Sequence, residues 1–336
     1  MPSVYAAAIL GVNSGGALRK IRVAVVGAGS FGQHHLRVLR ESGRAELVAV
    51  VDTDGARAQE AAQRFACEAL EDARRLAGRV EAAVVAVPTS AHAEVGGALL
   101  EAGIDVLVEK PIAADPASAR RLVETAEARG RVLQVGHLER FNPAVAALRS
   151  VARLPLFFEV HRLSVFTPRS LDVDVVLDLM IHDLDIVLSL TGQMPEEIRA
   201  AGISILSRRV DIANVRLAFP GGCVANLTAS RVSTERVRKL RMFQPHQYVS
   251  LDYTRQDALV LEVSPDRQLG SRLLAVEKAE PLALELEAFL EAVETRRAPA
   301  VSGAEACRAL EVALAILDKI EEHSRLVAHT LESWKS

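Results

Sequence analysis

The sequence has few of the residues that mark disulfide-rich, nucleic-acid-binding or membrane proteins. Its three cysteines, Cys67, Cys223 and Cys307, are odd in number, far apart and set among apolar neighbours, which argues against a disulfide framework or a cysteine metal site. A formal net charge of -3 leaves no basic excess for nucleic acid. No stretch reaches membrane-spanning length without charges. These absences predict a globular cytoplasmic protein with no metal and no nucleic-acid or membrane partner.

What the sequence does contain, near its N-terminus, is a βαβ unit of the kind that binds a dinucleotide. An apolar strand over Val23 to Val26 leads into the turn G-A-G-S-F-G, which is followed by an amphipathic helix and a second apolar strand. Gly27 permits the tight turn, Gly29 lets the backbone approach a pyrophosphate, and Gly32 lets the helix pack close to the strand. The helix N-terminus offers free N–H groups and a positive dipole to the phosphates.

The second strand ends on Asp52, twenty residues after Gly32, where an acid is placed to bind the ribose hydroxyls of the cofactor. Its negative charge would repel a 2′-phosphate, which favours NAD over NADP. Arg57 lies five residues further on. It either pairs with such a phosphate or is a solvated helix arginine, so NADP stays open as the less favoured cofactor.

Strands and helices continue to alternate up to about residue 135. Apolar strands are expected at 82–87, 104–108 and 132–135, and helices at 56–65, 91–102 and 116–129. This order predicts a parallel, doubly wound sheet, which binds ligands at the carboxyl ends of its strands. The predicted cofactor contacts at that edge are Gly27, Gly29, Ser30, Phe31, Gly32, Asp52, Thr53, Pro88, Thr89, His92 and Glu109.

Lys110 is the first candidate for catalysis. It directly follows an apolar strand and precedes Pro111, which constrains the turn and aims the lysine at the edge where a nicotinamide is expected. A loop lysine paired with Glu109 would have the same position. Position alone does not separate these two interpretations.

The pattern changes after residue 140. Runs at 157–163, 198–206, 211–219, 223–230, 237–243 and 259–263 often alternate apolar and polar residues, as antiparallel strands with one covered face do. The turn Pro220–Gly222 is expected to join two of them as a hairpin. Helices are expected at 141–151, 174–190, 284–295 and 303–326. The last two are amphipathic and are expected to pack on the parallel sheet.

The helix at 174–190 carries the second candidate for catalysis. Asp178 and His182 are four residues apart and project from one face, with Asp185 three residues further on. A neighbouring carboxylate can fix the tautomer of a histidine and stabilise its imidazolium, which suits a general base working near neutral pH. A core histidine, or a pair that only supports the helix, would have the same spacing. No cysteine or second histidine lies at ligand spacing nearby, which argues against a metal.

Four motifs in this order resemble the Gfo/Idh/MocA oxidoreductase family. They are G-A-G-S-F-G with its following Asp52, A-V-P-T-S-A-H at 86–92, E-K-P at 109–111 and D-L-M-I-H-D at 178–183. The resemblance runs from about Ile21 to the C-terminal helices. It implies an α/β protein with an N-terminal Rossmann domain and a C-terminal α/β domain, whose large, mostly antiparallel open sheet forms homodimers or homotetramers. It also implies that Lys110, Asp178 and His182 form the catalytic group.

A narrower resemblance rests on G-H-L-E-R-F-N-P-A at 136–144 and on D-V-D-V-V-L-D-L-M-I-H-D at 172–183. These segments resemble family members that oxidise C3 of UDP-N-acetylglucosamine with NAD to a 3-keto nucleotide sugar, a step toward amino sugars of lipid A. The alternatives are a dehydrogenase or keto-reductase for another substrate, such as UDP-N-acetylglucosaminuronate or an inositol-like polyol, and a non-catalytic sugar sensor.

A nucleotide sugar needs a pyrophosphate site, and arginine forks match phosphate oxygens. The predicted substrate contacts are Lys110, Arg140, Asn142, Arg162 and His182. The expected division of the chain is an N-terminal extension at 1–20, a Rossmann domain at 21–140, a substrate and oligomerisation domain at 141–283, and C-terminal helices at 284–336 that pack back on the Rossmann domain.

Overall fold

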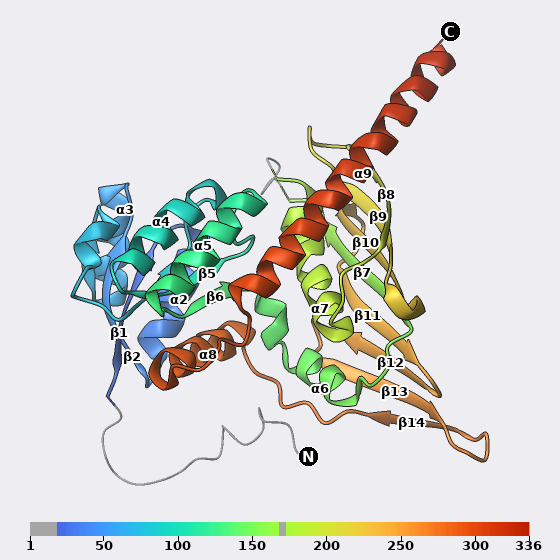
Figure 1. The fold of residues 1–336 in the computed structure, drawn as a ribbon, viewed down its shortest axis with the longest axis horizontal. Helices are drawn as coiled ribbons and strands as arrows, with labels where there is room; N and C mark the ends of the chain where they lie inside the picture. The colour runs from blue at the N-terminus through green and yellow to red at the C-terminus, as the bar shows by residue number, and fades with distance from the viewer. Residues whose placement is uncertain (1–18, 168–172, 336) are drawn as a thin grey trace.

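The computed structural model describes residues 19–167 and 173–335, so nearly all of the expected extension at 1–20 lies outside the described residues. The described chain forms two sheets that lie side by side, with the last helix running along both (Figure 1). Within these ranges, no helix combines the length and the apolar character needed to cross a membrane.

The first sheet is parallel and has the strand order β3-β2-β1-β4-β5-β6. Its strands are β1 (Ile21–Val26), β2 (Ala45–Val51), β3 (Glu68–Leu70), β4 (Ala82–Val85), β5 (Asp105–Glu109) and β6 (Leu133–Gly136). The order reverses between β1 and β4, which makes this edge the switch point where such sheets bind their ligands. The predicted Rossmann sheet is confirmed, with β3 as a short addition that the sequence analysis did not predict.

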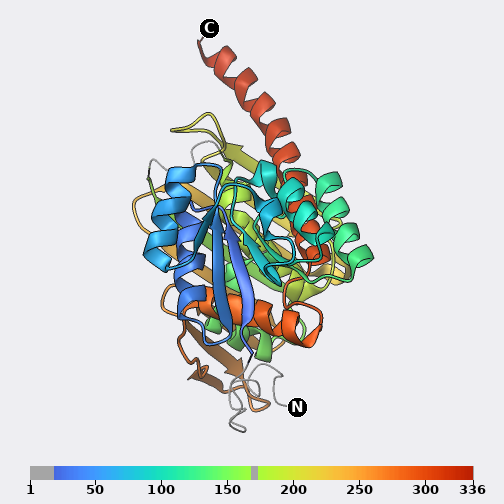
Figure 2. The ribbon, with the colours of Figure 1, turned by 90° about the vertical axis from the view of Figure 1, so that its left-hand side faces the viewer.

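Helices cover both faces of this sheet, and Figure 2 shows the strands between the two helix layers. The helices are α2 (Ser30–Glu41), α3 (Gly55–Phe65), α4 (Thr89–Glu101), α5 (Pro116–Arg129), α8 (Pro281–Thr295) and α9 (Gly303–Lys335), with a 3₁₀ helix at Ala73–Leu76. Leu36 of α2 and Phe289 of α8 belong to the core on one face, and Leu122 of α5 and Leu310 of α9 to the core on the other. Coverage on both faces explains why the central residues of these strands form apolar runs instead of alternating with polar residues.

The second sheet has eight strands in the order β14-β13-β12-β11-β7-β10-β9-β8. They are β7 (Phe157–Val165), β8 (Glu197–Ile203), β9 (Ile212–Ala218), β10 (Val224–Ser233), β11 (Val237–Gln244), β12 (Gln247–Asp252), β13 (Asp257–Val263) and β14 (Leu269–Leu273). Neighbouring strands are antiparallel except β7 and β10, which are parallel. The expected large, mostly antiparallel sheet is therefore confirmed, as is the hairpin of β9 and β10 around Pro220–Gly222.

Two strands of this sheet were missed in the sequence. β14 lies at the edge of the sheet and is exposed along its whole length, so it has no buried face to impose an apolar alternation. β12 follows β11 after a turn of only two residues, and Val249 and Leu251 are its only buried positions. Two apolar residues are too few to form a recognisable period.

One face of the second sheet is covered by α6 (Pro143–Val151), a π-helical turn (Val176–Met180), α7 (Ile181–Thr191) and the middle of α9 (Figure 1). The expectation that both C-terminal helices pack on the Rossmann domain holds for α8 but not for all of α9. Its stripe from Ala309 through Ile316 to Ile320 belongs to the core of the second domain, whereas Ala306 and Leu310 contact the Rossmann core. The helix therefore joins the two domains, because its two apolar faces bury against different sheets.

Candidate active site

The glycine turn after β1 forms a cradle that fits a dinucleotide pyrophosphate. Gly27 has φ of 101°, and a Cβ there would lie 2.3 Å from the carbonyl oxygen of Ala86. A Cβ on Gly32 would lie 1.8 Å from the carbonyl oxygen of Gly27, so only glycine allows α2 to begin this close to the strand. A Cβ on Gly29 would meet no atom within 4 Å, so the space over this residue is open to a ligand.

The carboxylate of Asp52, at the end of β2, lies beside this turn. It accepts hydrogen bonds from the backbone N–H of Ala28 at 2.8 Å and of Asp54 at 2.9 Å. The guanidinium of Arg57 lies 3.4 Å from both carboxylate oxygens, and half of its side chain is exposed. An acid and an arginine therefore meet where the ribose of the adenosine half is expected, and the geometry fits NAD or NADP.

The other predicted cofactor residues lie at the same edge of the sheet, with one exception. Ser30 and Phe31 begin α2, Thr53 follows Asp52, and Pro88 and Thr89 begin α4. A hollow of about 330 Å³ opens beside them and is lined by Phe31, His34, Glu109, Leu138, Glu280, Pro281 and Leu282. Their contacts with the cofactor remain predictions.

The exception is His92, which is buried in α4 and is not placed to contact the cofactor. Its Nδ1 lies 2.8 Å from the carbonyl oxygen of Pro111, and its Nε2 lies 2.9 Å from that of Val87. Burial lowers the pKa of His92, so the ring is neutral and its single N–H donates to one of these two carbonyl oxygens. The prediction that His92 binds cofactor is corrected, since its ring nitrogens face backbone carbonyl oxygens in the loops that follow β4 and β5.

Lys110 extends from the end of β5 toward the second domain, and its peptide bond with Pro111 is cis. Its ammonium donates a hydrogen bond of 2.6 Å to the carbonyl oxygen of Asp178 and lies 3.5 Å from the carboxylate of the same residue. Burial lowers the pKa of Lys110, while the charges of Asp178 and Glu109 oppose this shift. The lysine side chain is therefore held by Asp178 and is not simply a loop lysine paired with Glu109.

His182 lies in the first turn of α7, directly after the π-helical turn that carries Asp178. Burial and the positive charges of Lys110 and Arg162 hold the pKa of His182 well below its usual range, so the imidazole is neutral at neutral pH. Its Nδ1 is buried and has no hydrogen-bond partner among the described residues. The expected hydrogen bond from the imidazole of His182 to the carboxylate of Asp178 is not found, because Asp178 holds the ammonium of Lys110 instead.

Two buried ion pairs fix the helix that carries His182. Arg162 donates to the carboxylate of Asp183 at 2.6 and 2.9 Å, and Arg140 donates to that of Asp185 at 2.7 Å from each of two nitrogens. Such bidentate pairs set orientation as well as distance. Because both aspartates are close in sequence to His182, these pairs hold the imidazole relative to both domains.

These contacts correct three of the predicted substrate residues. The side chains of Arg140 and Arg162 are 6% and 3% exposed, and the acceptors for their N–H groups are internal carboxylates. Asn142 is also buried, accepts from the backbone N–H of Ala144 and donates to the carbonyl oxygen of Tyr253. All three side chains support the fold around the site, and the structure does not place them to contact a pyrophosphate.

A second histidine at the site was missed in the sequence. His137 follows β6 directly, is 1% exposed, and its ring centroid lies 6.4 Å from that of His182. Neither ring nitrogen has a hydrogen-bond partner among the residues that the structure describes. The rule that singled out Lys110, a polar residue directly after a parallel strand, applies equally to His137 and would have found it.

Behind Lys110, a buried carboxylate pair connects β5 to the helices on its other side. Glu109 lies 2.7 Å from Nε2 of His35 in α2. Burial raises the pKa of Glu109, but the hydrogen bond and charge of His35 and the charge of Lys110 together lower it below its ordinary value. Glu285 of α8 is fully buried, and its carboxyl oxygens have no hydrogen-bond partner within the described ranges. Burial and the charge of Glu109 raise the pKa of Glu285 well above its ordinary value, which favours the protonated form.

Replacing Glu285 with glutamine is expected to stabilise the protein, increasingly so as the pH rises. Folding raises the pKa of this carboxyl group, so the folded state keeps its proton when the unfolded state has lost it. The free energy of unfolding therefore falls as the pH rises above the unfolded pKa of about 4.3, by up to about 1.4 kcal/mol per pH unit. The neutral amide removes this dependence. Thermal unfolding at pH 5.5 and pH 8 would measure the difference, with Glu291→Gln on the same helix as the control. An equal effect at both pH values would contradict the prediction.

Residues 21–137 match the family model described as "Oxidoreductase family, NAD-binding Rossmann fold", and residues 153–244 match the "GFO/IDH/MocA C-terminal domain". The UDP-N-acetylglucosamine 3-dehydrogenase of Acidithiobacillus ferrooxidans is 34% identical over 307 residues, covering 90% of this chain and 97% of that protein. The chain belongs to the Gfo/Idh/MocA oxidoreductase family. A solved structure of the Acidithiobacillus enzyme superposes with a TM-score of 0.86 and covers 91% of this chain and 99% of the other.

Two more distant proteins are similar over nearly the whole chain. An inositol 2-dehydrogenase of Rhizobium meliloti is 25% identical over 91% of this chain and 98% of its own length. A levoglucosan dehydrogenase in complex with NADH and levoglucosan is 19% identical, with a TM-score of 0.82 over 91% of this chain and 98% of the other. At that identity, the last comparison supports the fold alone.

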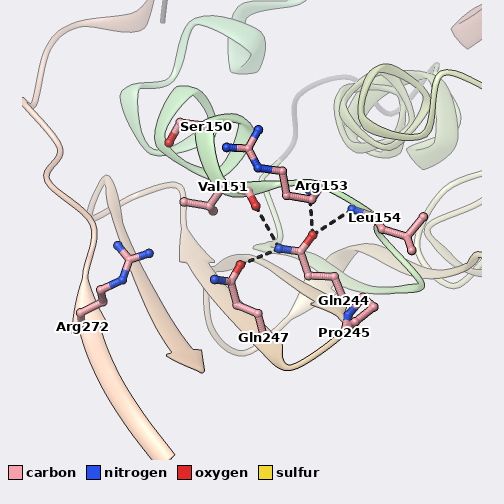
Figure 3. Close-up of a pocket in the computed structure, with 8 residues that line it drawn as sticks. All are labelled: Ser150, Val151, Arg153, Leu154, Gln244, Pro245, Gln247 and Arg272. Atoms are coloured by element: carbon pink, nitrogen blue, oxygen red, sulfur yellow. Dashed lines mark hydrogen bonds between the residues drawn. The ribbon is translucent and has the colours of Figure 1, made fainter. Parts of the chain in front are cut away.

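A second hollow, of about 410 Å³, lies where the end of α6 meets the β11–β12 turn, and none of the residues that line it is a predicted site residue. It is lined by Ser150, Val151, Arg153, Leu154, Gln244, Pro245, Gln247 and Arg272 (Figure 3). The amide of Gln244 donates to the carbonyl oxygen of Val151 and to Gln247, and it accepts from the backbone N–H of Arg153. Gln244 therefore joins the end of α6 to the β11–β12 turn.

Proposed function

We propose that this oxidoreductase is an NAD-dependent dehydrogenase that oxidises the C3 hydroxyl of UDP-N-acetylglucosamine to a ketone. The observation that carries the chemistry is the meeting of Lys110, from the Rossmann domain, with Asp178 and His182, from the second domain. A cation and a neutral base thus share one buried site beside the cofactor edge. A neutral base can take the hydroxyl proton, and a cation stabilises the negative charge that develops on the oxygen.

When bound, the dinucleotide supplies the acceptor for the hydride. His182, neutral because of its burial and its positive neighbours, accepts the proton of the substrate hydroxyl. Lys110 donates a hydrogen bond to the same oxygen, where negative charge develops as the proton leaves. Asp178 keeps the lysine ammonium at that point. The products are a ketone, the reduced dinucleotide and a proton held on His182.

The choice of substrate rests on the Acidithiobacillus UDP-N-acetylglucosamine 3-dehydrogenase, which is similar over both domains. The more distant inositol 2-dehydrogenase keeps a polyol as the alternative substrate. The test is formation of reduced nicotinamide, followed by absorbance, with UDP-N-acetylglucosamine, UDP-N-acetylglucosaminuronate, myo-inositol and glucose. An aminotransferase and glutamate should be added to remove a ketone that forms at an unfavourable equilibrium.

Reduced cofactor formed only with UDP-N-acetylglucosamine, together with a 3-keto product, would support the proposal. Turnover of a free polyol but of no nucleotide sugar would overturn the substrate and leave the chemistry intact. No turnover of any of these compounds, together with binding of one of them, would favour a sugar sensor.

We propose NAD rather than NADP as the cofactor, and replacing Asp52 with asparagine is expected to lower the ratio of kcat/KM with NAD to that with NADP by about tenfold or more. The amide keeps the shape of the side chain but removes the charge that would repel a 2′-phosphate. Arg57→Ala is the companion variant, and it should reduce the remaining activity with NADP. A wild-type preference for NADP that Arg57→Ala abolishes would contradict this proposal.

We also propose that the protein is a homo-oligomer through the uncovered face of the second sheet. On that face the Phe243 ring lies 5.6 Å from the Phe157 ring and 4.9 Å from the Tyr248 ring, measured between centroids across neighbouring strands. Phe243→Glu is expected to shift the protein toward monomer in size-exclusion chromatography with light scattering. Met194→Glu, on an exposed loop after α7, is the control. A monomeric wild type would refute the proposal.

A further inference from the structure

The sheet register places His137 beside Lys110 at the carboxyl edge of the parallel sheet. Glu109 pairs with Gly136 across β5 and β6, so the chain leaves the sheet at neighbouring points with Lys110 on one strand and His137 on the other. The His137 and His182 rings are nearly perpendicular, with an interplanar angle of 86°. Two histidines from different domains thus border the space in which Lys110 and His182 meet the substrate hydroxyl.

The ring nitrogens of His137 have no role in the hydrogen bonds of the described residues. A buried imidazole that makes no hydrogen bond costs free energy, and such groups are rare in native proteins. A leucine would fill the same volume without that cost. Both nitrogens of His137 are nonetheless buried with no partner in the described part of the chain. This points to a partner that the chain itself does not supply.

The charged groups around His137 are already engaged with one another. Asp185 accepts both of its short hydrogen bonds from Arg140, and Glu109 is bonded to His35. Lys110 is held by Asp178. Burial lowers the pKa of His137, and the positive charges of Arg140 and Lys110 lower it further. The negative charges of Asp185 and Glu109 oppose this shift without reversing it, so the ring is neutral. A neutral imidazole offers one donor and one acceptor, which matches a hydroxyl or an amide.

We propose that His137 hydrogen-bonds the substituent on a carbon next to the one oxidised and so helps to select the sugar. This inference rests on the proposed function, because it takes the hydroxyl at His182 as the one oxidised. In UDP-N-acetylglucosamine oxidised at C3, the neighbouring groups are the 4-hydroxyl and the 2-acetamido group. Both are neutral and can donate and accept hydrogen bonds, as the ring of His137 can.

The test is substrate affinity of the NADH-bound enzyme by titration calorimetry, for the wild type and for His137→Leu. Losing the contact is expected to weaken UDP-N-acetylglucosamine binding about 10- to 100-fold, with NADH affinity within twofold of wild type. His137→Gln should recover part of the affinity, and it also serves if the leucine variant does not fold. His323→Leu, far along α9, is the matched control.

Two analogues show whether the loss belongs to the predicted contact. The 4-deoxy sugar lacks one neighbouring group, and UDP-glucose replaces the other with a hydroxyl. If His137 contacts one of these groups, the wild type should bind the analogue that lacks it more weakly than UDP-N-acetylglucosamine. His137→Leu, which has already lost the contact, should bind that analogue and UDP-N-acetylglucosamine with similar affinity. The difference between the two losses is the coupling that a double-mutant cycle measures. Equal losses in both proteins for both analogues, or a leucine variant with normal affinity and lower thermal stability, would show a merely structural histidine and overturn the proposal.

Failure of the proposed function is visible in the same experiment. A wild type that neither binds nor oxidises UDP-N-acetylglucosamine refutes that substrate without reference to His137. The same cycle is then made with the sugar or polyol that the wild type does oxidise and with its deoxy analogues, where absence of coupling to His137 again overturns the inference.

Discussion

Replacing Lys110 with methionine is expected to lower kcat by about 10²- to 10³-fold while NADH affinity stays close to wild type. The lysine side chain is only 12% exposed and its ammonium lies 2.6 Å from the carbonyl oxygen of Asp178, so its charge is only weakly screened by water. Methionine fills a similar volume but offers no charge to the developing alkoxide. Steady-state kinetics with the substrate and NAD, together with NADH fluorescence titration, would measure both effects.

The lowered pKa of Lys110 adds a pH dependence to this prediction. Lysine acts here in its charged form, so kcat should fall as the pH rises through that pKa, below the ordinary value of about 10.4. The variant should lack this alkaline limb. Lys319→Met, which removes an exposed lysine paired with Glu322 in α9, is the control. Turnover of Lys110→Met within a few fold of wild type would show that the ammonium is not part of the chemistry.

Replacing His182 with asparagine is expected to lower kcat/KM by about 10²- to 10⁴-fold, the range typical of a lost general base. The imidazole can accept a proton near neutral pH because burial and the charges of Lys110 and Arg162 keep it neutral. Protonation at lower pH blocks the base, so the wild-type activity should fall only as the pH drops below about 6.5. The measurement is kcat/KM against pH for both proteins.

The variant should lose this acid limb as well as rate, and the shape of the profile distinguishes the base from a residue that only supports the helix. His161→Asn, on the outer face of β7, controls for the loss of a histidine elsewhere. An acid limb that persists unchanged in His182→Asn would assign the titration to another group. His137 would then be the first candidate, since it lies beside His182 and its pKa is also lowered by burial.

The sequence by itself determined the features that depend on local spacing. The glycine turn requires Gly27 and Gly32 for steric reasons that act within one βαβ unit. The alternation of strands and helices implies a parallel sheet, and the carboxyl edge of that sheet is where Lys110 was sought. The spacing of Asp178 and His182 on one helix made His182 a candidate, and the family resemblance, not the spacing alone, favoured it over a core histidine.

Only the tertiary structure decided which polar side chains face a ligand and which are used by the fold. The sequence predicts Arg140 as a phosphate ligand. In the structure its guanidinium instead forms ion pairs with Asp185 and Glu305, which lie far along the chain. Asp178 was expected to orient the imidazole of His182. In the structure it accepts a hydrogen bond from Lys110, which belongs to the other domain. Ion pairs form between charges that tertiary packing brings within a few ångströms of each other. The distance between residues far apart in the sequence cannot be predicted from hydrophobic periodicity.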